Sequence, residues 1–306
     1  MVETGEYARA NERIHKEYLP FQKGKTFTSE DVYNFFQLQK YPPDKASKIK
    51  HAISEVLYNL STVNKDKELV QDRKYYRLID KTAEEVKWWE SNEEMRELPL
   101  RLPMGLNDFC LLDSPCLIVI ASPTNQGKTA FILDLISQNI YEGSPYNNKI
   151  TLFESDPPEQ LKRRFSKFEF PIPVPPPFKV YRRLSNFEDV IDPNGLNLVD
   201  YIRVDTQRMW AVQDTQLKIL SKLGKDGIAV VALQKPPGRD LAYGKDFTAF
   251  DSTLYLSMES GKLKFVKIKT PKPMDGQDPY KFTICYKIKY GVQFYDIHRE
   301  YGDESL

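Results

Sequence analysis

The 306-residue sequence lacks the features that mark membrane, secreted and metal-binding proteins. No apolar run approaches the ~18 residues of a membrane-spanning helix, and the beginning, MVETGEYARANERIHKEY, is too polar for a secretory signal peptide. The cysteines are not spaced like metal ligands, and their odd number argues for reduced thiols: Cys110, Cys116 and Cys285. We therefore expect a cytoplasmic protein with no membrane partner.

An excess of charge is also absent, since 44 Lys and Arg residues nearly balance 43 Asp and Glu residues and leave a net charge of +1. The charge of the whole molecule therefore gives no argument for a nucleic-acid partner, which local patches would have to hold. Hydrophobic residues make up 41% and charged residues 28%, as in ordinary globular proteins. The length suits one large domain or two modest ones.

What is present is a stretch from Cys116 to Tyr141, CLIVIASPTNQGKTAFILDLISQNIY. The run 117–121 is apolar and has the length of a buried strand. The loop SPTNQGKT follows, and the next apolar residues recur at helical spacing: Phe131, Ile132, Leu135, Ile136 and Ile140. A strand, a loop ending in Gly-Lys-Thr and a helix together form the context of a phosphate-binding loop.

The loop residues have the types that phosphate binding needs. Backbone amides of the loop and of the first helical turn can cradle phosphate oxygens. Gly127 permits close backbone approach, Lys128 offers a charge to the β- and γ-phosphates, and Thr129 offers a hydroxyl to Mg²⁺. We therefore predict that ATP and Mg²⁺ bind here, and that the nucleotide contacts Ser122, Pro123, Thr124, Asn125, Gln126, Gly127, Lys128, Thr129 and Ala130.

The loop departs from the pattern G-x-x-x-x-G-K-[ST] at one position, because Ser122 stands where the first glycine is expected. We take this change as tolerable, since the strictest dihedral demand falls on Gly127. The alternative interpretation is a chance Gly-Lys-Thr in an ordinary strand-to-helix turn.

The rest of the C-terminal part predicts a three-layer α/β core of alternating strands and helices. The expected strands span 149–156, 195–202 and 227–235, and the expected helices span 157–165 and 214–224, the second closed by Gly224. The proline-dense segment 168–178 cannot be helical and is expected to wrap the surface. Three alternating antiparallel strands are expected after residue 252.

Polar residues end three of these strands, at the edge where ligands bind in parallel sheets. Asp200 follows an apolar run and suits a Mg²⁺-coordinating carboxylate, although a strand-end aspartate facing water gives the same pattern. Glu154 and Asp156 both qualify as the base that activates water, and we prefer Glu154 for its longer reach. Gln234 is placed to hydrogen-bond a γ-phosphate.

The order SPTNQGKT, LFESDPPEQL, LVDYI, VVALQK and a K-x-K strand is similar to that of RecA-like ATPases, particularly the replicative hexameric helicases and related phage-encoded proteins. The resemblance covers residues 100–296 and implies an ATPase domain at 109–297 with a tail at 298–306. It assigns water activation to Glu154 or Asp156, magnesium coordination to Asp200 and γ-phosphate sensing to Gln234. It also implies a ring or filament with ATP sites between subunits.

The same family carries a basic pair, usually K-x-R, on a late strand, where it reaches into the site of the neighbouring subunit. Lys267 and Lys269 occupy the matching place. Lysine lacks the planar fork of arginine, which puts efficient turnover in question more than nucleotide binding. An exposed face of a half-solvated sheet is the alternative interpretation of these lysines.

Two loops would face the centre of such an assembly, and both combine positive charge with aromatic residues. Loop 201–213 carries Arg203, Arg208 and Trp210, and loop 236–250 carries Arg239, Tyr243 and Lys245. This combination suits single-stranded DNA. Both loops also contain acids, so that ordinary surface loops are the alternative.

The N-terminal part predicts a second, smaller domain. Residues 1–25 are polar, and we expect a loosely held arm. Within 26–82, a helix capped by Thr28 or Ser29, a helix at 44–60 and a hairpin at 67–80 together resemble a winged-helix domain. A connector at 83–108 is expected to contain a short helix with Trp88 and Trp89, and the domain boundary is placed near residue 90.

The winged-helix resemblance implies binding of duplex DNA, with the second helix in a groove and the hairpin as the wing. The cationic residues that would contact DNA are Lys45, Lys48, Lys50 and His51 on the helix and Arg73 and Lys74 on the wing. Many winged helices mediate only protein contacts, and these side chains can equally form a solvated face.

The leading hypothesis is an oligomeric, DNA-associated, RecA-like ATPase of the helicase, recombinase or loader type. The second is a nucleotide-regulated DNA-binding or scaffold protein with little turnover. The third is a phosphotransferase that acts on a small substrate, which we expect to be monomeric and indifferent to DNA.

Overall fold

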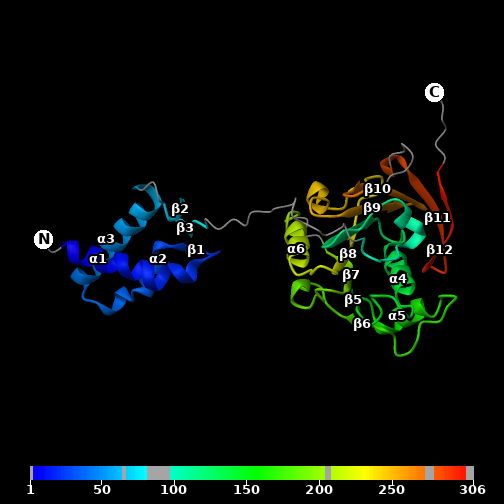
Figure 1. The fold of residues 1–306 in the computed structure, drawn as a ribbon, viewed down its shortest axis with the longest axis horizontal. Coiled ribbons are helices and arrows are strands. Elements are labelled where there is room, and N and C mark those ends of the chain that lie inside the picture. Colours follow the sequence, from blue (N-terminus) through cyan, green and yellow to red (C-terminus); the bar gives the residue numbers. More distant parts are fainter. Residues whose placement is uncertain (1–2, 64–66, 81–96, 204–207, 273–278, 301–306) are drawn as a thin grey trace, which may run out of the picture. The chain divides into compact units, whose positions relative to one another are not determined.

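The computed structural model describes residues 3–63, 67–80, 97–203, 208–272 and 279–300. The chain divides into two compact units, residues 1–91 and 92–306, close to the boundary expected near residue 90. Both appear in Figure 1. The expected helix around Trp88 and Trp89 lies outside the described residues. None of the described helices is both long enough and apolar enough to span a membrane.

The described part of the first unit combines three α-helices with a small antiparallel sheet of order β1-β3-β2. Its elements are α1 (Glu3–Arg13), β1 (Thr26–Thr28), α2 (Ser29–Phe35), α3 (Pro43–Tyr58), β2 (Leu69–Asp72) and β3 (Tyr75–Leu78). A π-helical turn (Ile14–Tyr18) and a 3₁₀ turn (Leu19–Gln22) extend α1, a 3₁₀ turn (Leu38–Lys40) precedes α3, and a π-helical turn (Asn59–Val63) follows it. The expected helices and hairpin of this unit are present.

The predicted cap of α2 is confirmed, because Thr28 and Asp31 form a capping box. The Asp31 N–H donates to Thr28 Oγ1 at 3.3 Å, and the Thr28 N–H donates to Asp31 Oδ2 at 2.6 Å. This exchange satisfies two backbone donors that the first helical turn would otherwise leave unpaired.

The prediction of a loosely held N-terminal arm is wrong, because α1 and its extension pack on the core of the unit. Ala10, Ile14 and Tyr18 are buried, and the Tyr18 ring lies edge-on to Phe27 with centroids 5.2 Å apart. These three residues recur every fourth position and form one narrow stripe. Charged residues surround that stripe, so the apolar signal was weak in the sequence.

The second unit is an α/β fold built on one nine-stranded sheet of order β12-β11-β10-β9-β4-β8-β7-β5-β6. Strands β9 to β6 run parallel, and β10, β11 and β12 extend the sheet in antiparallel fashion. The strands are β4 (Cys116–Ser122), β5 (Ile150–Glu154), β6 (Phe178–Tyr181), β7 (Leu196–Ile202), β8 (Ile228–Gln234), β9 (Leu254–Glu259), β10 (Lys262–Ile268), β11 (Thr283–Lys289) and β12 (Gln293–Arg299).

Helices cover both faces of this sheet. They are α4 (Lys128–Asn139), α5 (Pro158–Phe165) and α6 (Ala211–Leu220), with 3₁₀ turns at Pro103–Asp108, Phe187–Asp189, Lys245–Thr248 and Pro279–Lys281. Ile118 and Ile120 of β4 join the apolar cluster of α4 and α5, whereas Leu117 and Val119 join the cluster of α6. Burial on both faces explains why the central strands are continuous apolar runs.

Four details of the expected α/β layout need correction. Strand β9 is parallel to β4, so the antiparallel part begins only at β10. Strand β6 begins within the proline-dense segment, and β12 reaches Arg299, inside the expected tail. Helix α6 ends at Leu220, and Gly224 does not cap it, since the Gly224 N–H donates to the Pro193 carbonyl at 2.7 Å. Strand direction is decided by non-local pairing, which residue alternation does not encode.

Candidate functional site

Residues 122–129, which we call the Gly127 loop, join β4 to α4 and are shaped by Gly127. This residue has φ +104°, a left-handed conformation that favours glycine. A Cβ atom there would lie 2.9 Å from Ile288 Cδ1 and 3.2 Å from Met258 Cε. The dihedral demand expected at Gly127 is therefore present, and close packing adds to it. Helix α4 begins directly after this turn, so that its N-terminal amides border the loop.

Lys128 folds back over the Gly127 loop. Its Nζ donates hydrogen bonds to the carbonyl oxygens of Ser122 and Pro123, both at 2.9 Å. Burial lowers the pKa of Lys128, and the charge of Asp200 opposes that shift. Lys128 is therefore close enough to Asp200 to interact with it, although α4 and β7 are far apart in the sequence.

Asp200 and Thr129 meet at the end of β7, as expected for two ligands of one cation. Asp200 is 5% exposed, and burial raises its pKa. A hydrogen bond from Thr129 and the charges of Lys128 and Arg164 act in the opposite direction. No group of three or more His, Cys, Asp or Glu residues in the described part of the chain could hold a metal ion. One hydroxyl and one carboxylate fit Mg²⁺, which keeps several waters and takes further oxygens from phosphates.

Glu154 lies beside Asp200, because the two residues are register partners on β5 and β7. Its Oε1 accepts hydrogen bonds from the N–H groups of Ser155 at 2.7 Å and Asp156 at 3.0 Å. Burial, followed by the Asp200 charge, raises the pKa of Glu154 to about 7, even though those hydrogen bonds act to lower it. A buried carboxyl with such a pKa can take up or release a proton near neutral pH.

Asp156 is oriented differently from Glu154. Its Oδ2 forms an ion pair with Arg164 of α5 at 2.7 Å. The sequence left the choice between the two acids open. The structure places Glu154 opposite Asp200 and engages Asp156 with α5.

Gln234, the last residue of β8, contacts the Gly127 loop. It is the register partner of Ser122, and its Nε2 donates to Thr124 Oγ1 at 2.9 Å. The amide side chain therefore lies where the sequence predicted it, at the parallel-strand edge that also carries Glu154 and Asp200.

A buried ion pair behind Gln234 was not predicted. Lys235 is 2% exposed, and its Nζ lies 2.5 Å from Glu259 Oε2. Glu259 also accepts from the Gly238 N–H at 2.9 Å, and the next residue, Ser260, donates its N–H to Gln126 Oε1 at 3.0 Å. The β9–β10 turn thus connects the Gly127 loop to the segment after Gln234. A lysine directly after a buried strand was the available signal, but its partner is 24 residues away.

Lys267 and Lys269 do not join this cluster. Ile268, between them, pairs with Leu254 at the start of β9, whereas the turn near the Gly127 loop is at the other end of that strand. The Lys267 Nζ donates to the carbonyl oxygens of Ala249 and Phe250, both at 2.8 Å. Lys269 is exposed. Their expected action in a neighbouring subunit stays a prediction.

The two loops expected to bind single-stranded DNA are neighbours. A Cβ atom on Gly244 would lie 3.3 Å from the Met209 carbonyl oxygen and 3.0 Å from Val212 Cγ1. Residues 204–207 of the first loop lie outside the described residues. The remaining candidates are all exposed: Arg203, Arg208, Trp210, Arg239, Tyr243 and Lys245. Phe247 and Phe250 are exposed as well and add aromatic surface that the prediction did not include.

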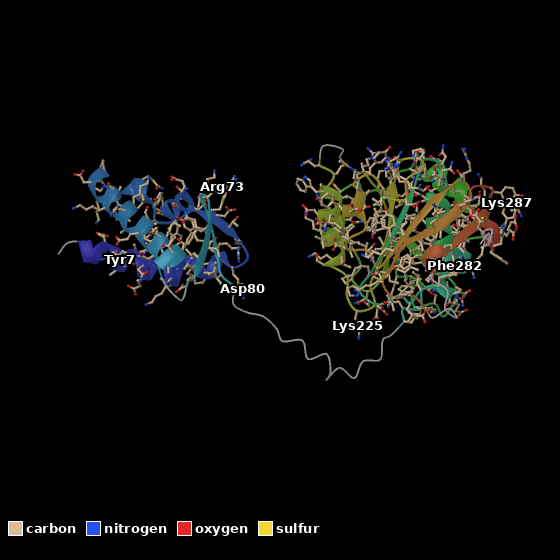
Figure 2. The ribbon with its side chains drawn as sticks, turned by 90° about the horizontal axis from the view of Figure 1, so that it is seen from above. Tyr7, Arg73, Asp80, Lys225, Phe282 and Lys287 are labelled. Carbon is tan, nitrogen blue, oxygen red and sulfur yellow. The ribbon has the colours of Figure 1, made fainter. Side chains whose placement is uncertain are left out.

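In the first unit, the cationic residues predicted to bind DNA are all exposed, and some of them lie beside aromatic rings. The Lys45 Nζ lies 5.3 Å from the centre of the Tyr41 ring, and the Lys50 Nζ lies 4.7 Å from that of Tyr33. Lys48 and His51 are exposed on α3, and Arg73 is exposed at the turn of the β2–β3 hairpin (Figure 2), where Lys74 stands beside Tyr75.

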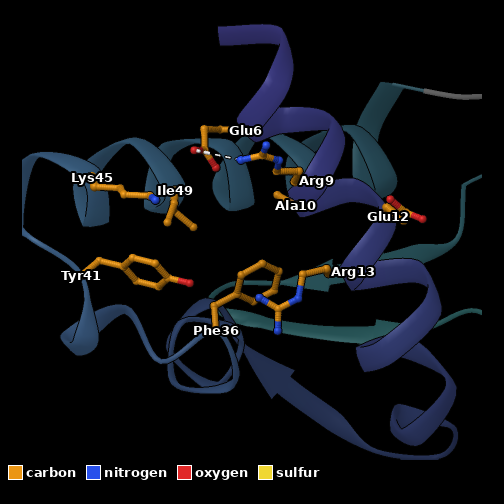
Figure 3. A pocket seen from close by; sticks show the side chains of 9 residues that line it. All are labelled: Glu6, Arg9, Ala10, Glu12, Arg13, Phe36, Tyr41, Lys45 and Ile49. Atoms are coloured by element: carbon orange, nitrogen blue, oxygen red, sulfur yellow. Dashed lines mark ion pairs between the residues drawn. The ribbon is translucent and has the colours of Figure 1, made fainter. Parts of the chain in front are cut away.

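Lys45 also borders a cavity of about 350 Å³ between α1 and α3, shown in Figure 3. Arg9 and Arg13 reach this cavity from α1, and the Arg13 guanidinium lies 4.3 Å from the centre of the Phe36 ring. The sequence interpretation missed both arginines because it assigned them to an arm. Glu6 pairs with Arg9 at 3.8 Å, so the surface is not uniformly positive.

A scan against protein-family models found no match for this chain, and a search of curated proteins found none either.

Proposed function

We propose that the second unit is a RecA-like ATPase core whose Gly127 loop is a phosphate-binding loop. The observation that supports this most is that the predicted site residues lie together at one edge of the parallel strands. Thr129 hydrogen-bonds Asp200, Asp200 stands opposite Glu154, and Gln234 contacts Thr124. These residues come from four separate segments, and each has the chemistry that hydrolysis of a nucleoside triphosphate requires.

In the proposed mechanism, backbone amides of the Gly127 loop and the first turn of α4 bind the phosphates. Lys128 exchanges its bonds to the Ser122 and Pro123 carbonyls for bonds to the β- and γ-phosphates. Thr129 and Asp200 would hold Mg²⁺, which neutralises phosphate charge. Glu154 orients the attacking water and accepts its proton on the carboxylate while the bond from the γ-phosphorus to the leaving oxygen breaks.

Loss of the γ-phosphate would be transmitted through Gln234. This side chain bonds Thr124 in the loop, and the segment that follows it is held by Lys235, Gly238 and Glu259. A shift of Gln234 would therefore change the position of the exposed residues at 236–250. We assign those residues and 208–213 to single-stranded DNA, because exposed cations and exposed aromatic rings occur together there.

For the first unit we propose a winged-helix domain that binds duplex DNA. Its order of helix, strand, helix, helix and hairpin, with β1 paired to β3, resembles that fold. The exposed cations on α3 and at the hairpin turn would contact phosphates. We further propose a homo-oligomer, a ring or filament, because Lys267 and Lys269 lie at the opposite end of the sheet from their own Gly127 loop.

Phosphate release from ATP, with and without single-stranded DNA, tests the enzymatic proposal. We expect Lys128→Ala to lower turnover by about 10²-fold or more, because removing one charge that acts on the transition state costs this much. Lys225→Ala is the matched control, since Lys225 is an exposed loop lysine (Figure 2) outside the cluster. A Lys128→Ala protein as active as the control would refute the enzyme.

A second function, nucleotide-controlled DNA binding with little turnover, is favoured by one observation. Lys267 is already bonded to the Ala249 and Phe250 carbonyls of its own chain, which opposes its reaching a neighbour. This alternative predicts that wild-type protein binds an ATP analogue and DNA but releases no phosphate above the Lys128→Ala level.

A further inference from the structure

A second cavity lies between α5 and β6, on the side of the sheet that α4 also covers. Its volume is about 380 Å³, within the range of small-ligand sites. Leu161 and Phe165 of α5 and Phe178 and Val180 of β6 form apolar walls. The rings of Phe165 and Phe178 have centroids 5.2 Å apart. Figure 1 shows both elements at the β6 edge of the sheet. Because these two rings are in contact, the apolar side chains form one continuous surface, which suits one face of a flat, apolar group.

The inner end of this α5–β6 cavity is formed by groups of the proposed ATPase site. Glu154, which is 5% exposed, lines the cavity and is also the register partner of Asp200. Asp156 lines it too, but Arg164 neutralises that carboxylate at 2.7 Å. The Glu154 carboxyl group therefore borders both the proposed ATPase site and the α5–β6 cavity.

The cavity also carries two cations, one from each wall. Lys162 of α5 and Arg182, just after β6, are exposed lining residues. Neither has an ion-pair or hydrogen-bond partner among the described residues. By strand alternation Phe178 and Val180 face this cavity, whereas Tyr181 packs against Phe153 on the other face. The neighbouring Lys179 is not a lining residue. The two cations leave the cavity complementary to an anion next to an apolar group.

We propose that the α5–β6 cavity binds one nucleotide unit of single-stranded nucleic acid, with its base against the apolar lining and its phosphate at Lys162 and Arg182. An aromatic ring joined to a phosphate matches both parts of the cavity. A paired base cannot enter, because its ring is stacked within a duplex. A free nucleotide has the same chemistry and is the other source to be distinguished.

This contact is separate from the loops at 208–213 and 236–250. Helix α6 packs with those loops on one apolar cluster of the sheet, whereas α5 packs on the other. Binding at the cavity does not require ATP. Its effect on hydrolysis, through Glu154, rests on the proposed function.

Photocrosslinking tests the proposal at this site alone, whatever else the chain binds. Full-length protein would be irradiated with an oligonucleotide that carries 5-iododeoxyuridine, and crosslinked peptides would be mapped by mass spectrometry. We expect crosslinks at Phe165 or Phe178. Val180→Trp, which fills the cavity, and the double variant Lys162→Ala with Arg182→Ala should each lower that yield by about tenfold, the size of one lost stacking contact.

Lys179→Ala is the matched control, since it removes a β6 charge that does not line the cavity, and it should stay within about twofold of wild type. The double variant of Lys162 and Arg182 changes only exposed side chains, so it still tests the cavity if Val180→Trp folds poorly. For this double variant, the slope of log affinity against log salt concentration should also become less steep by about 1.4, because two phosphate contacts are lost. Absence of the cavity crosslink in wild type, or equal yields in all variants, overturns the proposal.

Competition separates the sources of the ligand. Unlabelled single-stranded DNA should abolish the cavity crosslink. If thymidine monophosphate competes as well per nucleotide, the cavity takes free nucleotides; if it does not, the ligand is the polymer. Equal competition by duplex DNA overturns the proposal. A fluorescent ATP analogue, measured on the same samples, tests the Gly127 loop independently, so that failure of one site does not imply failure of the other.

Discussion

At the scale of single residues, the surroundings of Glu154 are unfavourable to a charged carboxylate. It ends an apolar strand, is buried, and stands opposite the buried Asp200. Two backbone N–H groups hold one of its oxygens in place. Burial and the Asp200 charge outweigh these two hydrogen bonds, favour the protonated acid and raise its pKa to about 7. A base with such a pKa is half ionised near neutral pH, where proton transfer is efficient.

Substitution of this carboxyl group tests its role as the base. Glu154→Gln should lower ATP turnover by about 10²–10⁴-fold while an ATP analogue still binds. Because only the ionised form accepts a proton, wild-type turnover should rise with pH through about 7 and then level off. The stability of the fold should change in the opposite sense. It should fall as the pH rises from the ordinary glutamate pKa of 4.5 to about 7 and then level off, since ionisation of a buried acid is unfavourable.

Asp156→Asn is the matched control, because it removes the neighbouring acid, which is paired with Arg164. Its pH–rate profile should keep the rising limb. Retention of that limb in Glu154→Gln together with its loss in Asp156→Asn would transfer the role of base to Asp156.

At the element scale, the turn between β9 and β10 fixes the segment after Gln234 through one ion pair. The Lys235 side chain is 1% exposed and that of Glu259 is 29% exposed. Hydrogen bonds from Lys235 and from the Gly238 N–H lower the pKa of Glu259. Removing the carboxylate would leave a buried ammonium group with a carbonyl partner, that of Arg239, but no negative charge, which is costly.

We therefore predict that Glu259→Ala lowers the free energy of unfolding by about 2–3 kcal/mol, less than for a fully buried pair because Glu259 is partly exposed. Denaturant unfolding measures this. In the wild type, the contribution should be present above the ordinary carboxyl pKa and disappear as the pH falls through the lowered pKa of Glu259. The control is Glu300→Ala, whose partner Lys262 is 48% exposed, and its cost should be much smaller, because solvent screens an exposed pair. Equal losses in the two variants would contradict the assignment.

The elements themselves differ in how far the sequence determines them. The central strands could be predicted because burial on both faces makes them continuous apolar runs. The cap of α2 could be predicted because Thr28 and Asp31 are local partners. Strand β6 could not, since only Phe178 of its four residues is buried. The positions of Glu154, Asp200 and Gln234 could be predicted because each lies at or near the end of an apolar strand. The Lys235–Glu259 pair could not be predicted, because it is a contact between segments that are distant in the sequence.

At the scale of the whole molecule, the balance of charge gives no steering towards a polyanion, so every proposed nucleic-acid contact is local. The site is also incomplete within one chain under the proposed function. Lys269 is exposed at the end of the sheet opposite to the Gly127 loop. A head-to-tail assembly is the arrangement that brings such opposite ends together, because it joins two different surfaces of identical chains.

Mixing two inactive variants tests this assembly. Glu154→Gln lacks the base and Lys269→Ala lacks the cation offered to the neighbour, so each should release little phosphate alone. When the two are mixed and reassembled, a site with Glu154 from one chain and Lys269 from the next should form at about a quarter of the interfaces. Turnover should recover to about that fraction of wild type. Mixing Glu154→Gln with Lys128→Ala is the control, because Glu154 and Lys128 belong to the same chain's site. In that mixture every site lacks either the base or the lysine, so turnover should not recover. No recovery in the first mixture, or full activity of Lys269→Ala alone, would place the complete site within a single chain.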